Sequence, residues 1–328
     1  MPAPLRSALV VALLALPIGG CTRAELAPRP SVATAPAAAA APRVDPVLQR
    51  SLDALVRGFP GDAGIYVRHL PTGRIAAVRA DEIFPTASMI KVPILVGTFD
   101  AVRRGEFTLQ DRWTYTDSLL YPGEDLTGML EDSSSVPVSK LVLLMTALSD
   151  NTASLWLQGR VGGATINRWL ADHGFDSTRI NSRVDGRRPD WERYGWGQTT
   201  PREMAELLVM IRDGRAVGPA ESAEMYRALT RSYWNGEALS QLPPWVQAAS
   251  KQGMVDRSRS EVVLVNAPSG DYVFTVITKN QTDTGNEASN PGYVLLRSVS
   301  ALLWRHFEPD SPWTPDARAA GFKPGEEG

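Results

Sequence analysis

Cysteine and histidine are both scarce in this chain of 328 residues. It has one cysteine, Cys21, and three histidines, His69, His173 and His306. A single cysteine cannot form a disulfide within the chain, so the fold must depend on its hydrophobic core. The histidines lie far apart in the sequence and lack a partner at metal-ligand spacing, which argues against a metal site. We therefore expect neither a metal nor another cofactor.

A large charge of one sign is also missing. The chain has 34 Lys and Arg against 36 Asp and Glu, a formal net charge of -2. Basic residues are scattered, and no basic stripe is interleaved with aromatic residues, so we expect no binding of nucleic acid. The sequence shows no internal repeat. Residues 46–309, roughly 260 residues, are expected to form one domain and a monomer that binds a small molecule.

A long apolar run stands at the amino terminus, from Leu9 to Leu16, after a single charge at Arg6. This run is too short for a permanent membrane helix, so residues 1–20 are predicted to be a signal peptide. Two glycines precede Cys21, as in a bacterial lipobox, in which the thiol is acylated and becomes the new amino terminus. An ordinary cleavage site beside an unrelated cysteine is the alternative.

The segment after Cys21 is rich in Ala, Pro, Thr and Ser. Residues 21–45 are therefore predicted to be a tether, and residues 310–328 a polar tail. A lipidated Cys21 would hold the protein on the periplasmic side of a membrane. Thr22, in place of an aspartate, favours the outer membrane if the host is Gram-negative.

The spacing of apolar residues and turn residues predicts an α/β (α+β) fold. Helical spacing and strand-like runs alternate along the domain. The predicted helices are 47–59, 92–103, 136–148, 153–158, 201–211 and 293–307, and the predicted strands are 63–70, 74–80, 246–253, 261–266 and 272–279. Strands at both chain ends, with helices between them, indicate an antiparallel sheet and an inserted helical region.

Ser88 and Lys91 form a Ser-x-x-Lys pair at a predicted helix start. Residues three apart on a helix share a face, so the lysine could take the proton of the serine hydroxyl if burial lowers its pKa. A serine at a helix N-terminus also directs its own N–H toward developing negative charge. The alternative is an N-cap serine beside a solvated lysine.

Ser149-Asp150-Asn151 lies between two predicted helices. It adds a second hydroxyl and an amide to the candidate site, which together with Ser88 and Lys91 suits acyl transfer. Ser, Asp and Asn also favour helix caps, so Ser149 and Asn151 could instead be capping residues.

Three ordered motifs resemble those of class A β-lactamases and related penicillin-recognising serine hydrolases. They are Phe84 to Lys91, Ser149 to Ala153, and Lys251-Gln252-Gly253 on a late strand. Gly162-Gly163 and Thr199-Thr200-Pro201 match as well. The resemblance covers residues 47–307. It implies a β-lactamase/transpeptidase-like fold, with a five-stranded antiparallel sheet, helices on both faces and an inserted helical subdomain.

The resemblance implies a role for each matching residue. Ser88 would attack the lactam carbonyl and form an acyl-enzyme, with Lys91 as proton acceptor or relay. Ser149 would pass a proton to the leaving nitrogen, Asn151 would hold the amide of the substrate side chain, and Lys251 would face the substrate carboxylate.

The strand of the third motif would complete the oxyanion hole. There the N–H of Met254 would act together with that of Ser88. A side chain at Gly253 would block the close approach of substrate to the strand. Tyr121, between the first two motifs, is a candidate wall of the cleft.

Gln252 is the first departure from the family pattern, which usually has a hydroxyl residue between Lys and Gly. An amide can still donate a hydrogen bond to a carboxylate, so we expect changed specificity rather than lost chemistry. Arg259 is a candidate to support Lys251 in binding that carboxylate. An exposed surface arginine is the alternative.

The second departure concerns the release of the acyl group. Class A enzymes activate water with a glutamate in a Glu-x-x-Leu-Asn segment, and the loop from Arg179 to Tyr194 lacks that segment. Asp185 has nearly the right distance from Thr199-Thr200, whereas Glu192 follows a tryptophan. Alternatively, the acids of this loop pair with its arginines, Arg183, Arg187, Arg188 and Arg193.

Three functions follow from these observations. The preferred one is a serine β-lactamase, with slow or altered deacylation. The second is a D-alanyl-D-alanine peptidase or another amidase or esterase on the same scaffold, acting on a cell-wall peptide. The third is a tethered sensor that becomes acylated and stays so.

Overall fold

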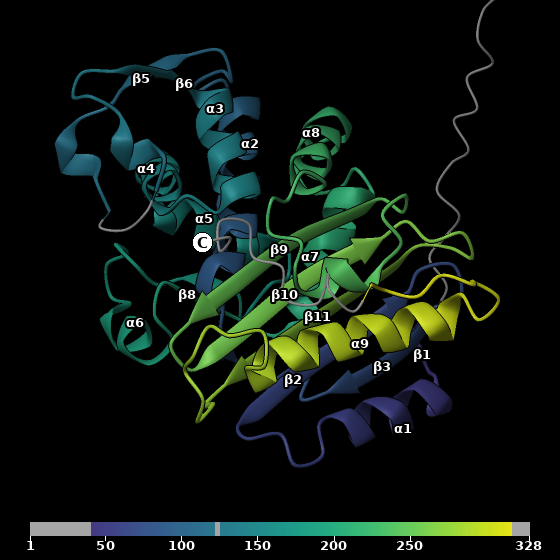
Figure 1. The fold of residues 1–328 in the computed structure, drawn as a ribbon. Helices are drawn as coiled ribbons and strands as arrows, with labels where there is room; N and C mark the ends of the chain where they lie inside the picture. The colour runs from purple at the N-terminus through teal and green to yellow at the C-terminus, as the bar shows by residue number, and fades with distance from the viewer. Residues whose placement is uncertain (1–40, 122–124, 317–328) are drawn as a thin grey trace, which may run out of the picture. The chain divides into compact units, whose positions relative to one another are not determined.

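A six-stranded sheet forms the centre of the computed structural model, which describes residues 41–121 and 125–316 (Figure 1). The strand order is β1-β3-β2-β11-β10-β9. The strands are β1 (Arg43–Val44), β2 (Asp62–His69), β3 (Arg74–Val78), β9 (Ala248–Val255), β10 (Ser258–Val265) and β11 (Tyr272–Lys279). Strands from both ends of the domain are therefore neighbours in one sheet, and β2 pairs antiparallel with β11.

The predicted antiparallel sheet is confirmed for β3, β2, β11, β10 and β9. The sixth strand, β1, was not predicted and runs parallel to β3. The predicted tether is therefore wrong for residues 43 and 44, because these pair with Arg74 and Ile75. The signal peptide, Cys21 and most of the tether lie outside the described residues.

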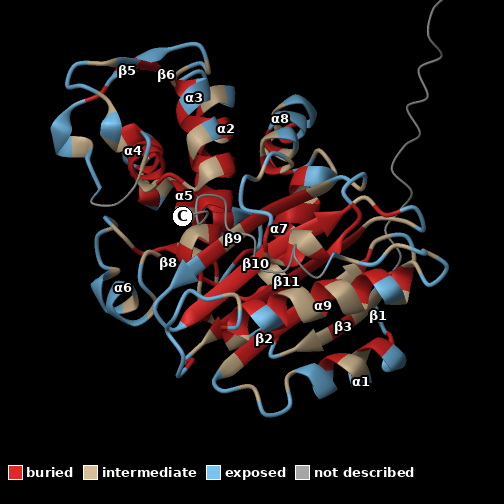
Figure 2. Ribbon diagram, in the orientation of Figure 1, coloured by how far each residue is buried: buried red, intermediate tan, exposed pale blue. Residues whose placement is uncertain are grey.

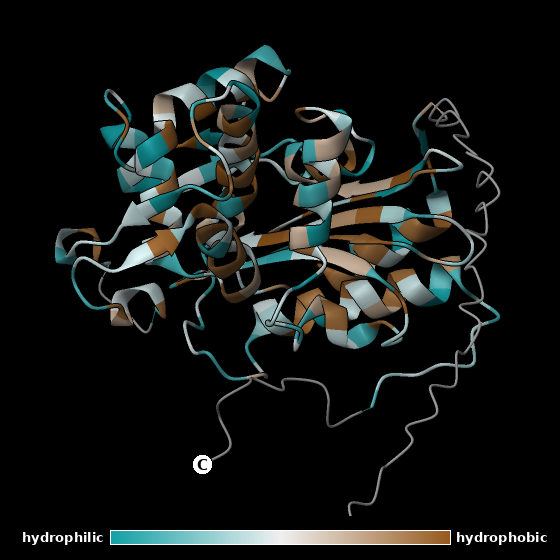
Figure 3. Ribbon diagram, turned by 90° about the horizontal axis from the view of Figure 1, so that it is seen from above, coloured by the Kyte–Doolittle hydropathy of each residue, from teal (hydrophilic) through white to brown (hydrophobic). Residues whose placement is uncertain are grey.

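Helices cover both faces of the sheet, as expected. On one face lie α1 (Pro46–Leu55) and α9 (Pro291–Phe307), whose apolar side chains form a core with the strands. On the other face lies α7 (Pro201–Arg212), which contacts β2, β10 and β11. Figure 2 shows β10 and β11 as buried and β3 as largely intermediate, and Figure 3 shows apolar residues along the strands and on α9. Trp313, in the predicted polar tail, also packs against the core beside α9.

A helical region is inserted between β3 and β9. Nearly every residue of its helix α2 (Lys91–Arg103) is buried, because other helices surround α2. The other helices of the insertion are α3 (Val138–Leu143), α4 (Asn151–Val161), α5 (Gly163–Asp172), α6 (Arg188–Tyr194) and α8 (Pro219–Leu229). Two small sheets complete it, formed by β4 (Phe84–Pro85), β7 (Arg179–Ile180) and β8 (Gly197–Thr199), and by β5 (Arg112–Thr114) and β6 (Ser135–Pro137).

The predicted helix over residues 136–148 is wrong at both ends. Its first residues belong to β6, and its last turn is a π-helix, η4 (Leu144–Leu148). Short π-helical turns inside helices are frequent at functional sites. This turn leads directly into Ser149, whose φ of 62° is left-handed. In the parts of the chain that the structure describes, no helix is both long and apolar enough to cross a bilayer.

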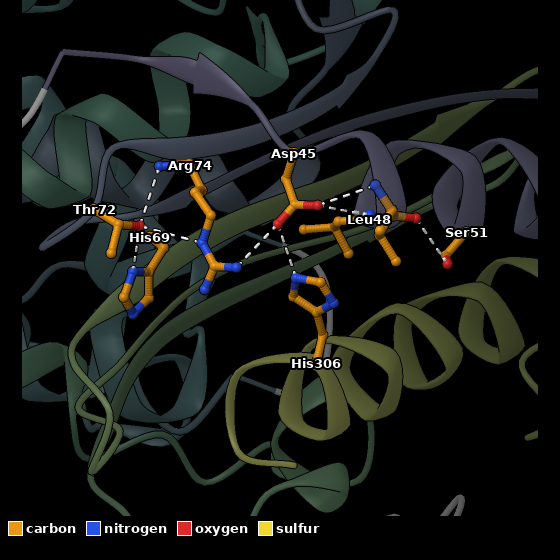
Figure 4. Close-up of polar contacts among 8 residues, drawn as sticks. Asp45, Leu48, Ser51, His69, Thr72, Arg74 and His306 are labelled. Carbon is orange, nitrogen blue, oxygen red and sulfur yellow. Dashed lines mark hydrogen bonds and ion pairs between the residues drawn. The ribbon is translucent and has the colours of Figure 1, made fainter.

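Asp45 joins the two ends of the domain (Figure 4). Its carboxylate accepts hydrogen bonds from the N–H groups of Val47 and Leu48, at 3.1 and 3.0 Å, and so caps α1. It also pairs with Arg74 of β3 at 3.2 Å and contacts His306 Nε2 of α9 at 3.0 Å. Burial alone would raise the pKa of Asp45. The hydrogen bonds to its carboxylate and the nearby cations lower the pKa by more than burial raises it, so the pKa is below its usual value.

Candidate active site

Ser88 lies in a 3-10 turn, η1 (Ala87–Ile90), which joins β4 to α2. The next two residues, Met89 and Ile90, are completely buried, and they fix the turn in the core. Ser88 itself is only partly buried. Its neighbour Ala87 has a left-handed φ of 45°, a conformation that costs an alanine energy and that marks many functional sites.

Strand β9 passes close to the Ser88 turn at Gly253. A Cβ atom at this position would lie 2.7 Å from the carbonyl oxygen of Thr86 and 3.0 Å from the nitrogen of Ser88. Only glycine therefore allows β9 to lie this close to the Ser88 turn, whereas the sequence argument expected glycine here for the approach of substrate. Met254 follows on the same edge strand, half exposed. The role of its N–H in an oxyanion hole stays a prediction.

Lys91 is the hub of the site. Its Nζ lies 3.1 Å from Ser88 Oγ, 3.0 Å from Ser149 Oγ and 2.6 Å from Asn151 Oδ1, and it also contacts the carbonyl oxygen of Ser149. The side chain is fully buried, so the solvated-lysine alternative is wrong. Burial lowers the pKa of Lys91 to about 7, although Asp125 and Asp150 act in the opposite direction. At neutral pH a substantial fraction is therefore an uncharged amine, as a base for Ser88 must be.

The cap of α4 is Asp150 rather than Ser149 or Asn151. Its carboxylate accepts hydrogen bonds from the N–H groups of Ala153 and Thr127, at 2.7 and 2.8 Å. This leaves the side chains on both sides of Asp150 for the site, where each contacts Lys91. Neither side chain therefore caps α4, although Ser149 is the C-cap residue of η4.

Lys251 reaches the site from β9. Its Nζ lies 3.0 Å from Ser149 Oγ and 2.9 Å from each of two oxygens of Gln252, the carbonyl and Oε1. The side chain is buried. Burial, and then the charge of Lys91, lower its pKa well below the usual value, while Glu261 acts in the opposite direction. Gln252 thus occupies the hydroxyl position of the family motif as a ligand of the lysine.

Arg259 does not have either of the expected roles. It is completely buried, so the surface alternative is wrong. Its guanidinium donates hydrogen bonds to the carbonyl oxygens of Val255, Asp256, Ser258, Thr284 and Gly285. It also lies over the ring of Tyr293, 5.0 Å from the centroid. Arg259 therefore holds the turn after β9 and the loop before α9, and these contacts occupy the guanidinium that was expected to support Lys251.

The acids of the predicted water-activating loop are exposed. Glu192 pairs with Arg188 at 2.7 Å, and Asp190 pairs with Arg187 at 2.8 Å, as the arginine alternative expected. Asp185 is exposed in the same loop. The acids whose charges act on Lys91 are Asp125 and Asp150 instead.

Sequence reasoning missed two residues near Lys91. Asp125 accepts hydrogen bonds from the N–H groups of Asn151 and Thr152, at 2.9 and 2.8 Å, and so secures the start of α4. Trp196 lies with its ring centroid 5.4 Å from Lys91 Nζ, and its indole N–H donates to Gln158. Neither residue belongs to a motif, although Trp196 immediately precedes β8.

Tyr121 lies beside the start of α4. Its N–H donates to Thr152 Oγ1 at 3.1 Å, and its side chain is exposed. Thr152 directly follows Asn151, so Tyr121 borders the site. A role as a wall of the cleft stays a prediction.

The chain belongs to the β-lactamase enzyme family, whose family model matches residues 47–307. Its sequence is similar to those of β-lactamases, and its fold is similar to those of PBP-A and of class A β-lactamases. A β-lactamase of Streptomyces lavendulae is 29% identical, over 92% of this chain and 95% of the relative. A β-lactamase of Streptomyces fradiae is 32% identical, over 78% of this chain and 82% of the relative.

Solved structures show the same fold. The structure of PBP-A has a TM-score of 0.74 and 28% identity, and it covers 83% of this chain and 100% of its own. A leucine-to-glutamate variant of PBP-A, in an acyl-enzyme complex with penicillin G, has a TM-score of 0.73 and 29% identity, with 82% and 99% covered. A β-lactamase from Sphaerobacter thermophilus, at 22% identity and a TM-score of 0.71, covers 81% of this chain and 97% of its own and supports the fold alone.

Proposed function

We propose that this protein is a serine β-lactamase that opens the β-lactam amide through an acyl-enzyme on Ser88. The observation that carries the proposal is the position of Lys91 Nζ, within hydrogen-bond distance of both Ser88 Oγ and Ser149 Oγ. A buried amine with a pKa of about 7 between two hydroxyls can accept a proton from one and return it through the other.

Acylation then proceeds in two proton transfers. Ser88 Oγ attacks the lactam carbonyl carbon while its proton passes to the neutral amine of Lys91. The oxyanion lies against the N–H of Ser88 and that of Met254. The carbon–nitrogen bond then breaks, and the lactam nitrogen takes a proton from Ser149, which is replenished from Lys91. The product is an ester on Ser88 and a ring-opened amine.

Deacylation is expected to be slow. Hydrolysis of the ester needs a water that an acid or a base holds near the carbonyl carbon. Glu192 is exposed and paired with Arg188, and Asp185 is exposed, so neither carboxylate is held by surrounding side chains in a position that would orient a water. A second candidate is a β-lactam-binding protein that stays acylated. It is supported by the similarity to PBP-A, because a variant of PBP-A has been solved as an acyl-enzyme complex with penicillin G.

The test uses the full-length chain with a chromogenic cephalosporin, followed by intact mass measurement. Multiple turnovers that disappear in Ser88→Ala support the β-lactamase. A stoichiometric adduct that persists on Ser88 supports the second candidate. If the protein shows no turnover and forms no adduct, both candidates are rejected. That outcome would favour an amidase or esterase that acts on other acyl groups, such as a D-alanyl-D-alanine peptide.

We further propose that the protein is a monomeric lipoprotein on the periplasmic side of a membrane, attached through Cys21. The apolar run before Gly19-Gly20-Cys21 supports this location. Labelling with a fatty acid analogue should mark the wild-type chain and leave Cys21→Ala unmarked. Equal labelling of both would overturn the proposal.

A further inference from the structure

Glu261, on β10, is a buried carboxyl group that the proposed reaction does not use. It is 1% exposed. One carboxylate oxygen accepts a hydrogen bond from Ser250 Oγ at 2.6 Å, and the other accepts one from the N–H of Ala238 at 2.9 Å. A buried acid costs stability unless it is paired, and buried acids with perturbed pKa values gather at functional sites. Its position relative to the site is therefore informative.

The register of the sheet places Glu261 opposite Gln252, one residue beyond the lysine of the third motif, whose own partner is Val262. Ser250, which donates to the carboxylate, stands on the other side of Lys251 in the same strand. The carboxylate is thus next to both residues that flank Lys251. The other flanking residue, Gln252, accepts two hydrogen bonds from the Lys251 ammonium.

The charges around Glu261 come from three elements. The charge of Lys251 acts on it across β9, because neighbouring side chains of a strand point to opposite faces, and Glu237 acts on it from the residue before η5 (Ala238–Gln241). The charge of Glu237 is balanced by Arg297 of α9, at 2.7 Å. Burial raises the pKa of Glu261 to about 7, while Lys251 and the two hydrogen bonds act in the opposite direction. Glu261 can therefore be an anion near neutral pH and a counter-charge for Lys251.

Lys251 needs such a counter-charge. The Nζ atoms of Lys251 and Lys91 both contact the Ser149 hydroxyl, so a positive charge on one amine makes protonation of the other less favourable. The charge of Lys91 disfavours the ammonium form of Lys251, and Glu261 favours it. Only the ammonium form attracts a carboxylate strongly.

We propose that Glu261 is a positioning residue that keeps Lys251 charged and in place, and that it thereby selects substrates bearing a carboxylate next to the scissile amide. The proposal rests on the proposed function, because the substrate is a β-lactam acid. Glu261 does not touch the substrate. It acts through Lys251 and through the strand segment from Ser250 to Gln252.

The experiment compares wild type with Glu261→Gln in the full-length chain. The readout is the second-order rate constant of acylation, measured from pH 5 to 9 with benzylpenicillin and with its methyl ester. We expect Glu261→Gln to lose about tenfold with the acid, the effect of one pK unit, and to change little with the ester. The pH above which the rate constant for the acid falls should also be lower in Glu261→Gln; we call this fall the alkaline limb. Lys251 loses a negative neighbour in this variant, so its ammonium group gives up its proton at a lower pH.

Glu206→Gln is the matched control. Glu206 is a partly buried acid on α7 that pairs with Arg68 at 2.8 Å and accepts a hydrogen bond from the Tyr66 hydroxyl, and both partners lie on β2. We expect its pH profile to match wild type. An equal loss with acid and ester in Glu261→Gln, or an unshifted alkaline limb, would overturn the proposal in favour of a purely structural role.

Ser250→Ala provides a milder second variant if Glu261→Gln does not fold. It removes one hydrogen bond to the carboxylate, which stabilises the anion, so the alkaline limb should shift in the same direction by a smaller amount. An unshifted limb in this variant would count against the proposal.

Binding to Ser88→Ala separates the two proposals. If wild type forms no acyl-enzyme, the proposed function fails. The role of Glu261 is still supported in that case if Ser88→Ala binds the acid more tightly than the ester and if adding Glu261→Gln removes this preference. If wild type is acylated and that preference survives Glu261→Gln, only the further inference fails.

Discussion

Lys91 and Lys251, 160 positions apart in the sequence, meet at one oxygen atom, because each Nζ lies 3.0 Å from Ser149 Oγ. Two buried amines at this separation from a shared hydroxyl oppose each other's protonation. One of them can therefore be neutral at physiological pH and serve as a base, while the other remains available for an anion. This arrangement divides the roles that the two lysine motifs were expected to have.

Replacing Lys91 by arginine should abolish acylation. A guanidinium stays protonated, so it cannot take the proton of Ser88. We expect the acylation rate to fall by about 10²–10⁴-fold, the usual contribution of a general base. Fluorescent penicillin labelling over time measures it, with Lys140→Arg, an exposed position on α3, as the control. A labelling rate for Lys91→Arg within threefold of wild type would exclude Lys91 as the base.

The acylation rate should rise with pH through about 7, the pKa to which burial lowers Lys91. The neutral amine is the reactive form, and it becomes populated as the pH passes that pKa. The rate should level off once the pH is above that pKa. Stopped-flow acylation from pH 5 to 9 provides the measurement. A rate independent of pH between 6 and 8 would contradict this assignment.

Glu192→Gln should leave turnover unchanged. Its carboxylate is exposed and bonded to Arg188, an i,i+4 pair that contributes about 0.3–0.5 kcal/mol to stability. The steady-state kcat for a chromogenic cephalosporin, if turnover is measurable, checks this, with Asp185→Asn beside it. A tenfold loss in Glu192→Gln would show that the loop rearranges to bring Glu192 to the acyl group.

Gly253→Ala should slow acylation without unfolding the protein. The added Cβ meets the backbone at Thr86 and Ser88, so β9 must move away from the nucleophile. We expect a loss of about tenfold or more in the acylation rate, since small displacements in an active site are costly. Gly159→Ala in α4, where a Cβ would meet nothing within 4 Å, is the control. A melting temperature close to that of wild type would assign the loss to the site.

Asp45→Asn should destabilise the domain most at neutral pH. The pKa of Asp45 is lowered in the folded state, so the anion contributes stability above its unfolded pKa, and that stability is lost as the pH falls through the folded value. We expect a loss of about 1 kcal/mol, because asparagine can still cap α1 and the loss comes from the pairing of the charge with Arg74 and His306. Urea unfolding at pH 7 and at pH 3 measures it, and the difference between variant and wild type should shrink at pH 3. Asp53→Asn, exposed on α1, is the control.

Much of the site was predictable because its chemistry is local in sequence. Ser88 and Lys91 are three residues apart, and Ser149, Asp150 and Asn151 are adjacent, so a turn or a helix start is enough to bring each set together. The five antiparallel strands followed from short apolar runs with turn residues between them. The prediction for the last turn before Ser149 was wrong because a π-helical turn of five residues is too short for its different period to show in the apolar pattern.

The motifs were therefore enough to predict a nucleophile, its base and the sheet that carries the third motif. The packing of the folded chain was needed to show that Arg259 faces carbonyl groups, that Glu192 faces solvent and that Glu261 pairs with Gln252. Strand register and the packing of neighbouring elements set the side on which each charge lies, and these depend on contacts between segments far apart in the chain. The spacing of apolar residues predicts helices and strands, but the position of a charged residue in the sequence does not show which partner it binds.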